Sequence, residues 1–210
     1  MPTITSKTVR AARRRGLTVL THRQWGSKCR ALYAQRRRDT ARGRWGTFRR
    51  QADTVAQHIT VTLDHGPLLG DFKADVRRVE QIGVDRFGSG VSYNWLVDMR
   101  TGTVAVGQPL DSKGTHTVNE KGVAGYSYDQ NLAARAIAVL GMPGDQLSAK
   151  AENAIVQLLA AMVETGAITE GFDYVPHSLF AAKDCPCGPT RDRMPEIREA
   201  VRDTLRKALR

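Results

Sequence analysis

The residues between His177 and Pro186 carry the side chains best suited to chemistry. His177 and Cys185 are eight positions apart, and Lys183 places an amine two residues before the cysteine. Far upstream, His58 adds a third side chain that can bind a metal. Two imidazoles and one thiolate leave one corner of tetrahedral Zn²⁺ open, which is typical of catalytic rather than structural zinc sites. The sequence therefore predicts a zinc hydrolase.

The segment around His58 has the pattern of a strand. Apolar residues alternate with threonines over residues 57–63, a period of two that is rich in β-branched side chains. A lone histidine on a strand is more often a buried core residue than a metal ligand, so this position needs support from other motifs.

Helical and extended patterns alternate along the rest of the chain, which predicts an α/β (or α+β) fold with a central mixed β-sheet flanked by helices. Ser148 is placed to cap one of the helices. The predicted elements are helices over 22–38, 71–82, 148–166 and 194–208, a hairpin from 93–98 and 103–106, a central strand over 136–140 and a last strand over 172–175.

Positive charge is concentrated at the start of the chain. Residues 1–50 contain 15 Lys and Arg and a single acid, Asp39, whereas residues 51–210 contain 17 bases and 20 acids. Such asymmetry is typical of contact with a polyanion, and it leaves nucleic acid, an anionic membrane and an acidic wall polymer open. Residues 1–15 hold few large apolar groups, so we expect them to form a flexible basic tail.

The chain shows no feature of export or membrane insertion. Its first residues lack the apolar core of a secretory signal, and no run of 18 apolar residues occurs. Cys185 and Cys187 are too close to bridge each other easily, so the cysteines make a poor disulfide framework. We expect a protein made in the cytoplasm, which needs another component to reach a substrate outside the membrane.

Five short motifs occur in the order found in one protein family. They are His58-Ile-Thr-Val-Thr62, Ser92-Tyr93-Asn94-Trp95-Leu96, Gly114-Thr115-His116-Thr117, Asn131 with the apolar run to Gly141, and His177 with Cys185-Pro186. With the Trp-Gly start at residues 21–26, they resemble the type-2 N-acetylmuramoyl-L-alanine amidase and peptidoglycan-recognition-protein family, especially its phage lysozyme-type amidases. The resemblance spans roughly residues 20–200 and implies the fold of that family.

The resemblance also implies roles for individual residues. His58, His177 and Cys185 would hold Zn²⁺, which lowers the pKa of a bound water to about 7. Lys183 would stabilise the oxyanion that develops on the attacked carbonyl, and Tyr93 would hydrogen-bond the water or that oxyanion. The rival interpretations are a solvated surface lysine and a tyrosine that only packs in the sheet.

Three further residues match family positions near the substrate groove. The resemblance implies substrate contact for His116, Asn94 and Thr60, and plain surface placement is an equal alternative for His116. Cys187 is a rival third ligand, but the eight-residue spacing and the proline of the family signature favour Cys185.

The chain departs from the family pattern before the first histidine, where residues 26–56 form a longer and more basic insert than expected. Ser92 also replaces the usual glycine before the family tyrosine. We predict a basic tail over 1–15, a basic helical segment over 16–56 packed on the core, and a zinc amidase domain over 57–210. With 41% hydrophobic residues, the chain of 210 residues can bury one such core.

The resemblance implies a monomeric phage endolysin that cuts bacterial peptidoglycan at the amide between N-acetylmuramic acid and L-alanine. Without an export signal, such an enzyme would stay in the host cytoplasm until it is released to the cell wall. Residues 1–50 would then contact an anionic wall polymer or the membrane surface, which attracts basic side chains by about 1 kcal/mol each.

Two other functions stay open. Some relatives bind peptidoglycan without cutting it, but these usually lack the metal cysteine that is present here as Cys185. Nucleic-acid binding through residues 1–50 is the less favoured alternative, because the aromatic residues that could stack on bases are also those a small core needs. These aromatic residues are Trp25, Tyr33, Trp45 and Phe48.

Overall fold

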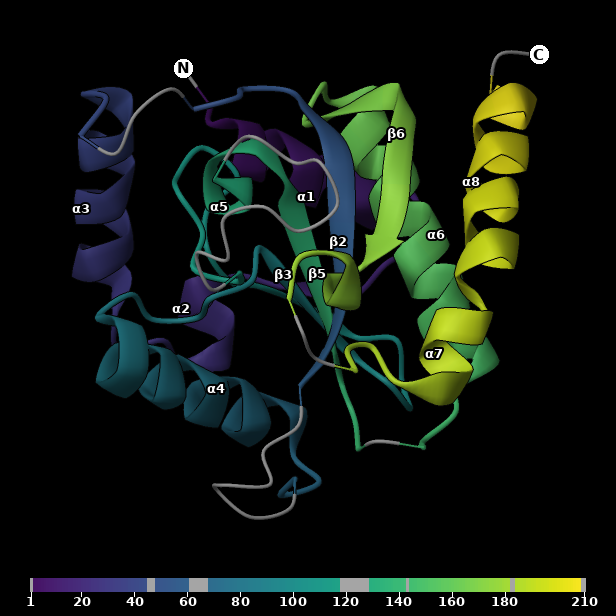
Figure 1. The fold of residues 1–210 in the computed structure, drawn as a ribbon, viewed down its shortest axis with the longest axis horizontal. Helices are drawn as coiled ribbons and strands as arrows, with labels where there is room; N and C mark the ends of the chain where they lie inside the picture. Colours follow the sequence, from purple (N-terminus) through teal and green to yellow (C-terminus); the bar gives the residue numbers. More distant parts are fainter. Residues whose placement is uncertain are drawn as a thin grey trace.

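A six-stranded mixed sheet crosses the molecule in a computed structural model that describes residues 2–44, 48–60, 68–117, 129–142, 144–181 and 184–208 (Figure 1). Neighbouring strands are parallel except β3 and β4, which form the predicted hairpin. The predicted mixed sheet is thereby confirmed. The strands in spatial order are β1 (Val19–Leu20), β4 (Val104–Val106), β3 (Trp95–Asp98), β5 (Arg135–Leu140), β2 (Ala52–Thr60) and β6 (Ile168–Pro176).

Helices cover both faces of the sheet, which makes the predicted α/β architecture. Figure 1 shows α6 beside α8 at one side of the view and α3 and α4 toward the other. The helices are α1 (Ile4–Arg14), α2 (His22–Trp25), α3 (Arg30–Ala41), α4 (Phe72–Phe87), α5 (Gln130–Ala133), α6 (Ala149–Glu164), the 3-10 turn η2 (His177–Leu179), α7 (Gly188–Asp192) and α8 (Met194–Ala208). The helices predicted over 71–82, 148–166 and 194–208 are confirmed as α4, α6 and α8, and Ser148 caps α6. Within the part of the chain described, no helix is long and apolar enough to cross a bilayer.

Alternate strand residues supply two separate core layers. Val55 and Ile59 of β2 belong to the larger cluster, which includes residues of α1, α6 and α8. Leu96 of β3 belongs to the smaller cluster, with Trp25 of α2 and residues of α4. Because successive side chains on a strand point to opposite faces, His58 lies on the face of β2 away from Ile59 and α6.

The first residues form a helix, so the flexible tail predicted for residues 1–15 is wrong. Helix α1 is capped by Thr3, whose side-chain oxygen accepts a hydrogen bond from the backbone N–H of Ser6 at 3.1 Å. Val9, Ala11 and Ala12 are buried in the larger core cluster, in contact with α6. Small residues repeat on one face of α1 and allow close helix packing, although composition alone makes the segment look too polar to fold.

The helix predicted over 22–38 is divided in two. Helix α2 ends at Gly26, whose φ of 84° is in the left-handed region, and α3 starts four residues later at Arg30. Buried Glu80 of α4 holds the turn, since it accepts hydrogen bonds from the Lys28 N–H at 2.9 Å and from Tyr33 Oη at 3.0 Å. A carboxylate in α4 therefore sets this break, which local periodicity cannot reveal.

Several strand boundaries also differ from the sequence prediction. Strand β2 starts at Ala52 instead of residue 57, and the predicted residues 61–63 lie outside the described part of the chain. Strand β6 starts at Ile168, four residues before the predicted position, and it ends directly before His177. The central strand predicted over 136–140 is confirmed as β5.

We predict that Ala12→Asp destabilises the protein by about 3–5 kcal/mol, because it buries a charge without a partner between α1 and α6. Arg10→Asp is the matched control on the exposed side of the same helix and should cost about 1 kcal/mol or less. Urea unfolding followed by circular dichroism measures both. Equal unfolding free energies for the two variants would contradict the packing of α1.

Candidate metal centre

Parallel pairing of β2 with β6 brings His58 next to His177. In the register of these strands Gln57 pairs with Pro176, so the next residue on each side is a histidine. The centroids of the two imidazole rings are 4.3 Å apart. One strand pair therefore joins the upstream candidate ligand to the C-terminal motif.

Cys185 lies close to the two histidines. The backbone N–H of Ser178 donates a hydrogen bond to the Cys185 carbonyl at 2.6 Å, and Cys185 Sγ lies 3.8 Å from the carbonyl oxygen of Ile59. One ligand atom from each of His58, His177 and Cys185 lies within 4.8 Å of the other two. Donor atoms around tetrahedral zinc lie about 3.3–3.8 Å apart, given bonds of about 2.0–2.3 Å, so small side-chain movements are sufficient.

The chemistry of the donors fits a zinc ion. His58 Nε2 is buried and has no hydrogen-bond partner in the described part of the chain. Leaving such an atom unsatisfied costs about 1–3 kcal/mol, which a bound cation would remove. The pKa of His58 is lowered well below its usual value, mainly by burial and to a smaller extent by the neighbouring charges of His177 and His116. The imidazole is therefore neutral at pH 7, which is the form that binds metals.

Tyr93 and His116 lie next to His58. The ring centroid of Tyr93 is 4.9 Å from that of His58, and the centroid of His116 is 5.3 Å away. Burial, followed by the charge of Cys185, raises the pKa of Tyr93 above its usual value, so the phenol keeps its proton at pH 7. Burial, followed by the charge of His177, lowers the pKa of His116 to about 3. Both side chains are thus uncharged polar groups beside the candidate ligands.

The loop that carries His116 is held by Asn131 and Gly114. The Asn131 side chain accepts a hydrogen bond from the Thr117 N–H at 3.0 Å and donates one to the Thr117 carbonyl at 2.8 Å. A Cβ at Gly114 would lie 2.9 Å from Cδ2 of His116, so a larger residue would push the ring away. The Gly-x-His motif and the asparagine before β5 thus have a structural explanation.

Asn94, which directly follows Tyr93, has a structural role. Its side chain is buried, donates a hydrogen bond to the Gln108 carbonyl at 3.1 Å and accepts one from the Ala136 N–H at 2.8 Å. One bond joins the start of β3 to the segment after β4 and the other joins it to β5. Both polar ends of the amide are therefore used, so we do not retain Asn94 as a substrate contact. Lys183 and the side chain of Thr60 lie outside the described residues, and their roles stay predictions.

The other candidate donors lie away from the group. Cys187 packs against the larger core cluster and does not belong to the one group of converging His, Cys, Asp and Glu side chains in the described ranges. His22 stacks on Tyr33 with a centroid distance of 4.3 Å, and its Nε2 lies 2.6 Å from the Gly107 carbonyl oxygen. The geometry therefore favours Cys185 over Cys187.

Two buried residues that the sequence prediction did not include, Gln57 and Tyr174, position His58. Tyr174 of β6 donates a hydrogen bond to the side-chain oxygen of Gln57, whose amide donates to the His58 carbonyl at 2.7 Å. This connection ties β6 to the backbone of the first candidate ligand. The sequence contained a signal for this role. Gln57 lies between Val55 and Ile59 on the side of the strand that faces the core, where a buried polar side chain needs a hydrogen-bond partner.

Comparison with known proteins shows a shared fold without detectable sequence similarity. No protein-family model and no curated protein sequence matches the chain. Solved structures with the same fold include three whose sequence identities establish the fold alone, and the predicted fold is thus confirmed. They are Drosophila PGRP-LB (TM-score 0.64, 15% identity, covering 83% of this chain and 91% of that one), Drosophila peptidoglycan recognition protein SA (0.63, 21%, 86% and 91%) and the N-acetylmuramoyl-L-alanine amidase LysC from Clostridium intestinale URNW (0.56, 18%, 72% and 86%).

We predict that the chain binds about one Zn²⁺ and that Cys185→Ala weakens this binding by about 100-fold or more, because the thiolate is lost. Competition with a coloured chelator measures the affinity. In the Co²⁺-substituted protein, a thiolate charge-transfer band should vanish in Cys185→Ala and remain in the matched control Cys187→Ala. The reverse result would assign the third ligand to Cys187.

Proposed function

We propose that the chain is a zinc-dependent N-acetylmuramoyl-L-alanine amidase, which hydrolyses the amide between N-acetylmuramic acid and L-alanine in peptidoglycan. The observation that supports this is the convergence of His58, His177 and Cys185 at the carboxyl ends of two parallel strands. In open sheets with parallel strands, ligands commonly bind beyond these ends. The same fold occurs in an amidase and in peptidoglycan recognition proteins.

The proposed ligands supply a suitable electrostatic environment. When bound, zinc supplies Lewis-acid chemistry and a source of hydroxide at neutral pH. Two neutral imidazoles and one thiolate offset only part of the charge of a divalent cation, so the centre stays attractive to a carbonyl oxygen. His58 lies on β2 and His177 directly follows β6, so two paired strands support both imidazoles rigidly.

Tyr93 and Lys183 are the proposed stabilisers of the tetrahedral oxyanion. A phenol that keeps its proton at pH 7 can donate a hydrogen bond to this oxygen, and Tyr93 lies beside His58. Lys183 is two residues before Cys185 and would bring a positive charge to the same oxygen. His116, whose pKa is lowered to about 3, is neutral at pH 7 and is proposed to contact substrate as an uncharged polar group.

Recognition of peptidoglycan without hydrolysis is the second candidate function. It is supported by the same fold in peptidoglycan recognition proteins, and one PGRP-LB variant is described in complex with tracheal cytotoxin. The complete set of three metal donors favours the hydrolase. A role as phage endolysin, released from the host cytoplasm to the cell wall, is proposed by analogy with an endolysin amidase of the same fold.

We predict that the zinc-loaded protein releases new L-alanine amino termini from purified peptidoglycan and forms no new reducing sugar ends. Amino-terminal labelling and a reducing-sugar assay measure the two products. Cys185→Ala should lose the activity, whereas Cys187→Ala should keep it within about twofold, since Cys187 only packs in the core. Tight binding of muropeptide without turnover would replace the amidase with the recognition function.

We predict that Tyr93→Phe and Lys183→Met each lower kcat by about 100-fold while zinc affinity stays unchanged, because each removes one stabiliser of the oxyanion. The matched control for the lysine is Lys150→Met, an exposed position in the first turn of α6. Steady-state kinetics on a soluble muropeptide measures kcat and KM. A change confined to KM would assign these residues to substrate binding.

A further inference from the structure

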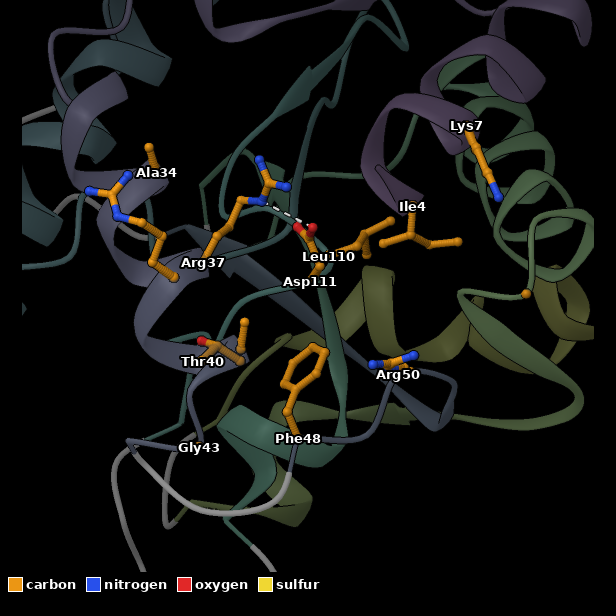
Figure 2. A pocket seen from close by; sticks show the side chains of 13 residues that line it. Ile4, Lys7, Ala34, Arg37, Thr40, Gly43, Phe48, Arg50, Leu110 and Asp111 are labelled. Carbon is orange, nitrogen blue, oxygen red and sulfur yellow. Dashed lines mark hydrogen bonds and ion pairs between the residues drawn. The ribbon is translucent and has the colours of Figure 1, made fainter. Parts of the chain in front are cut away.

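A second concave site lies at the opposite end of β2 from the candidate metal centre. This pocket has a volume of about 1140 Å³ and lies between α1, α3 and the segment that leads into β2 (Figure 2). Along β2, the step from Ala52 to His58 corresponds to about 20 Å at roughly 3.3 Å per residue. The pocket is therefore separate from the metal centre, although one strand connects them.

Cationic side chains from three segments line this basic pocket. They are Lys7 of α1, Arg37 and Arg38 of α3, and Arg50 before β2. Asp111 is the one acid of the lining, and its carboxylate lies 3.0 Å from Arg37 Nε. Figure 2 shows this pair joined across the pocket.

The other three cations of the basic pocket keep their charge available. Lys7, Arg38 and Arg50 are exposed, and none of them forms an ion pair with a residue in the described ranges. Arg38 donates a hydrogen bond to the side-chain oxygen of Gln35 at 2.6 Å, which leaves its charge uncompensated. Like charges in a concave surface raise the local positive potential and attract anions.

A buried arginine supports the pocket from behind. Arg135 is 1% exposed, and its Nη2 donates hydrogen bonds to the carbonyls of Arg49 at 2.5 Å and Arg50 at 3.1 Å. Its guanidinium lies 4.8 Å from the ring centroid of Phe48, which lines the pocket. Arg135 thus fixes the segment that carries Arg50 and adds a further positive charge beneath it.

The structure disfavours nucleic acid and membrane as the ligand of this site. Trp25 and Tyr33, which the sequence offered for stacking on bases, are 0% and 2% exposed and belong to the interior. Phe48, which the sequence also offered, lines the pocket, but the Arg135 guanidinium lies over its ring, 4.8 Å from the centroid. Trp45 lies outside the described residues. The large exposed apolar side chains of the described ranges are Leu69 and Phe87, at the loop before α4 and at its end, so none adjoins the pocket to enter a bilayer.

We propose that the basic pocket binds the phosphodiester backbone of a wall polymer without aromatic bases, of the polyol-phosphate class. Its cations match a chain of single negative charges, and its apolar residues Ile4, Leu110 and Phe48 match the hydrocarbon parts between phosphates. The inference that this polymer belongs to the cell wall rests on the proposed amidase function. Such binding would hold the enzyme at the wall while the metal centre, at the other end of β2, stays free for the stem peptide.

The test compares two double variants with the same change in net charge. Lys7→Glu/Arg50→Glu reverses two pocket cations, and Lys73→Glu/Lys150→Glu reverses two exposed lysines in the first turns of α4 and α6, where acids are favourable. Binding of fluorescent poly(glycerol phosphate) is measured by anisotropy between about 50 and about 200 mM salt. The pocket variant should bind about 10-fold or more weakly, with a salt slope shallower by about one per cation lost. The control variant should weaken about threefold or less.

Other outcomes overturn the proposal. If the two double variants lost affinity for the polymer equally, the binding would depend on the net charge of the protein and not on the basic pocket. Tighter binding of a single-stranded oligonucleotide with as many phosphates, lost on Lys7→Glu/Arg50→Glu, would assign the pocket to nucleic acid. Binding of phosphatidylglycerol vesicles but not of the polymer would assign it to lipid.

A further double variant, Lys7→Gln/Arg50→Gln, removes the two charges without reversing them. It should give an intermediate loss of polymer affinity with an unchanged unfolding midpoint.

Hydrolysis of a soluble muropeptide separates this proposal from the proposed function. This substrate carries no phosphate, so both double variants should hydrolyse it within about twofold of the wild-type rate, since all four positions are exposed and none is a proposed metal ligand or oxyanion stabiliser. Absence of hydrolysis by the wild-type chain would overturn the amidase. The anisotropy result would still decide whether the basic pocket binds the polymer.

Discussion

Parallel pairing of β2 with β6 is the constraint on which the candidate metal centre depends. It sets the register in which Gln57 faces Pro176, and that register alone places His58 beside His177. A slip of one residue would turn His58 to the face that carries Val55 and Ile59, because strand side chains alternate. The buried hydrogen bonds from Tyr174 to Gln57 and from Gln57 to the His58 carbonyl oppose such a slip.

Burial then decides the protonation of the groups around the centre. His58 and His116 are neutral at pH 7 because the protein interior disfavours an imidazolium, and Tyr93 keeps its proton for the corresponding reason. The charged form in each case would be less well solvated than in water. A divalent cation held by His58, His177 and Cys185, as proposed, would therefore have the uncharged Tyr93 and His116 beside it.

The two ends of β2 carry different chemistry. The candidate metal ligands lie toward its carboxyl end, whereas Arg50 and Phe48 precede its start and line the basic pocket with residues of α1 and α3. The basic residues within 1–50 therefore have different structural surroundings and different roles. Arg14 and Arg15 pair with Glu164 and fasten α1 to α6, while Lys7, Arg38 and Arg50 stay exposed. Basic residues that look alike in the sequence thus differ in role because their neighbours differ.

Residue types and their periodicity determined much of this protein: the alternating helices and strands, the β3–β4 hairpin, the central strand β5 and the ordered motifs that contain the candidate ligands. Only the tertiary structure decided which polar residues meet. The pattern could not distinguish Asn94, whose amide joins β3 to β5, from a groove residue, nor show that alanines of α1 pack on α6. The physical reason is that periodicity records which face a residue occupies, whereas its partner depends on strand order, register and crossings between elements far apart in the chain.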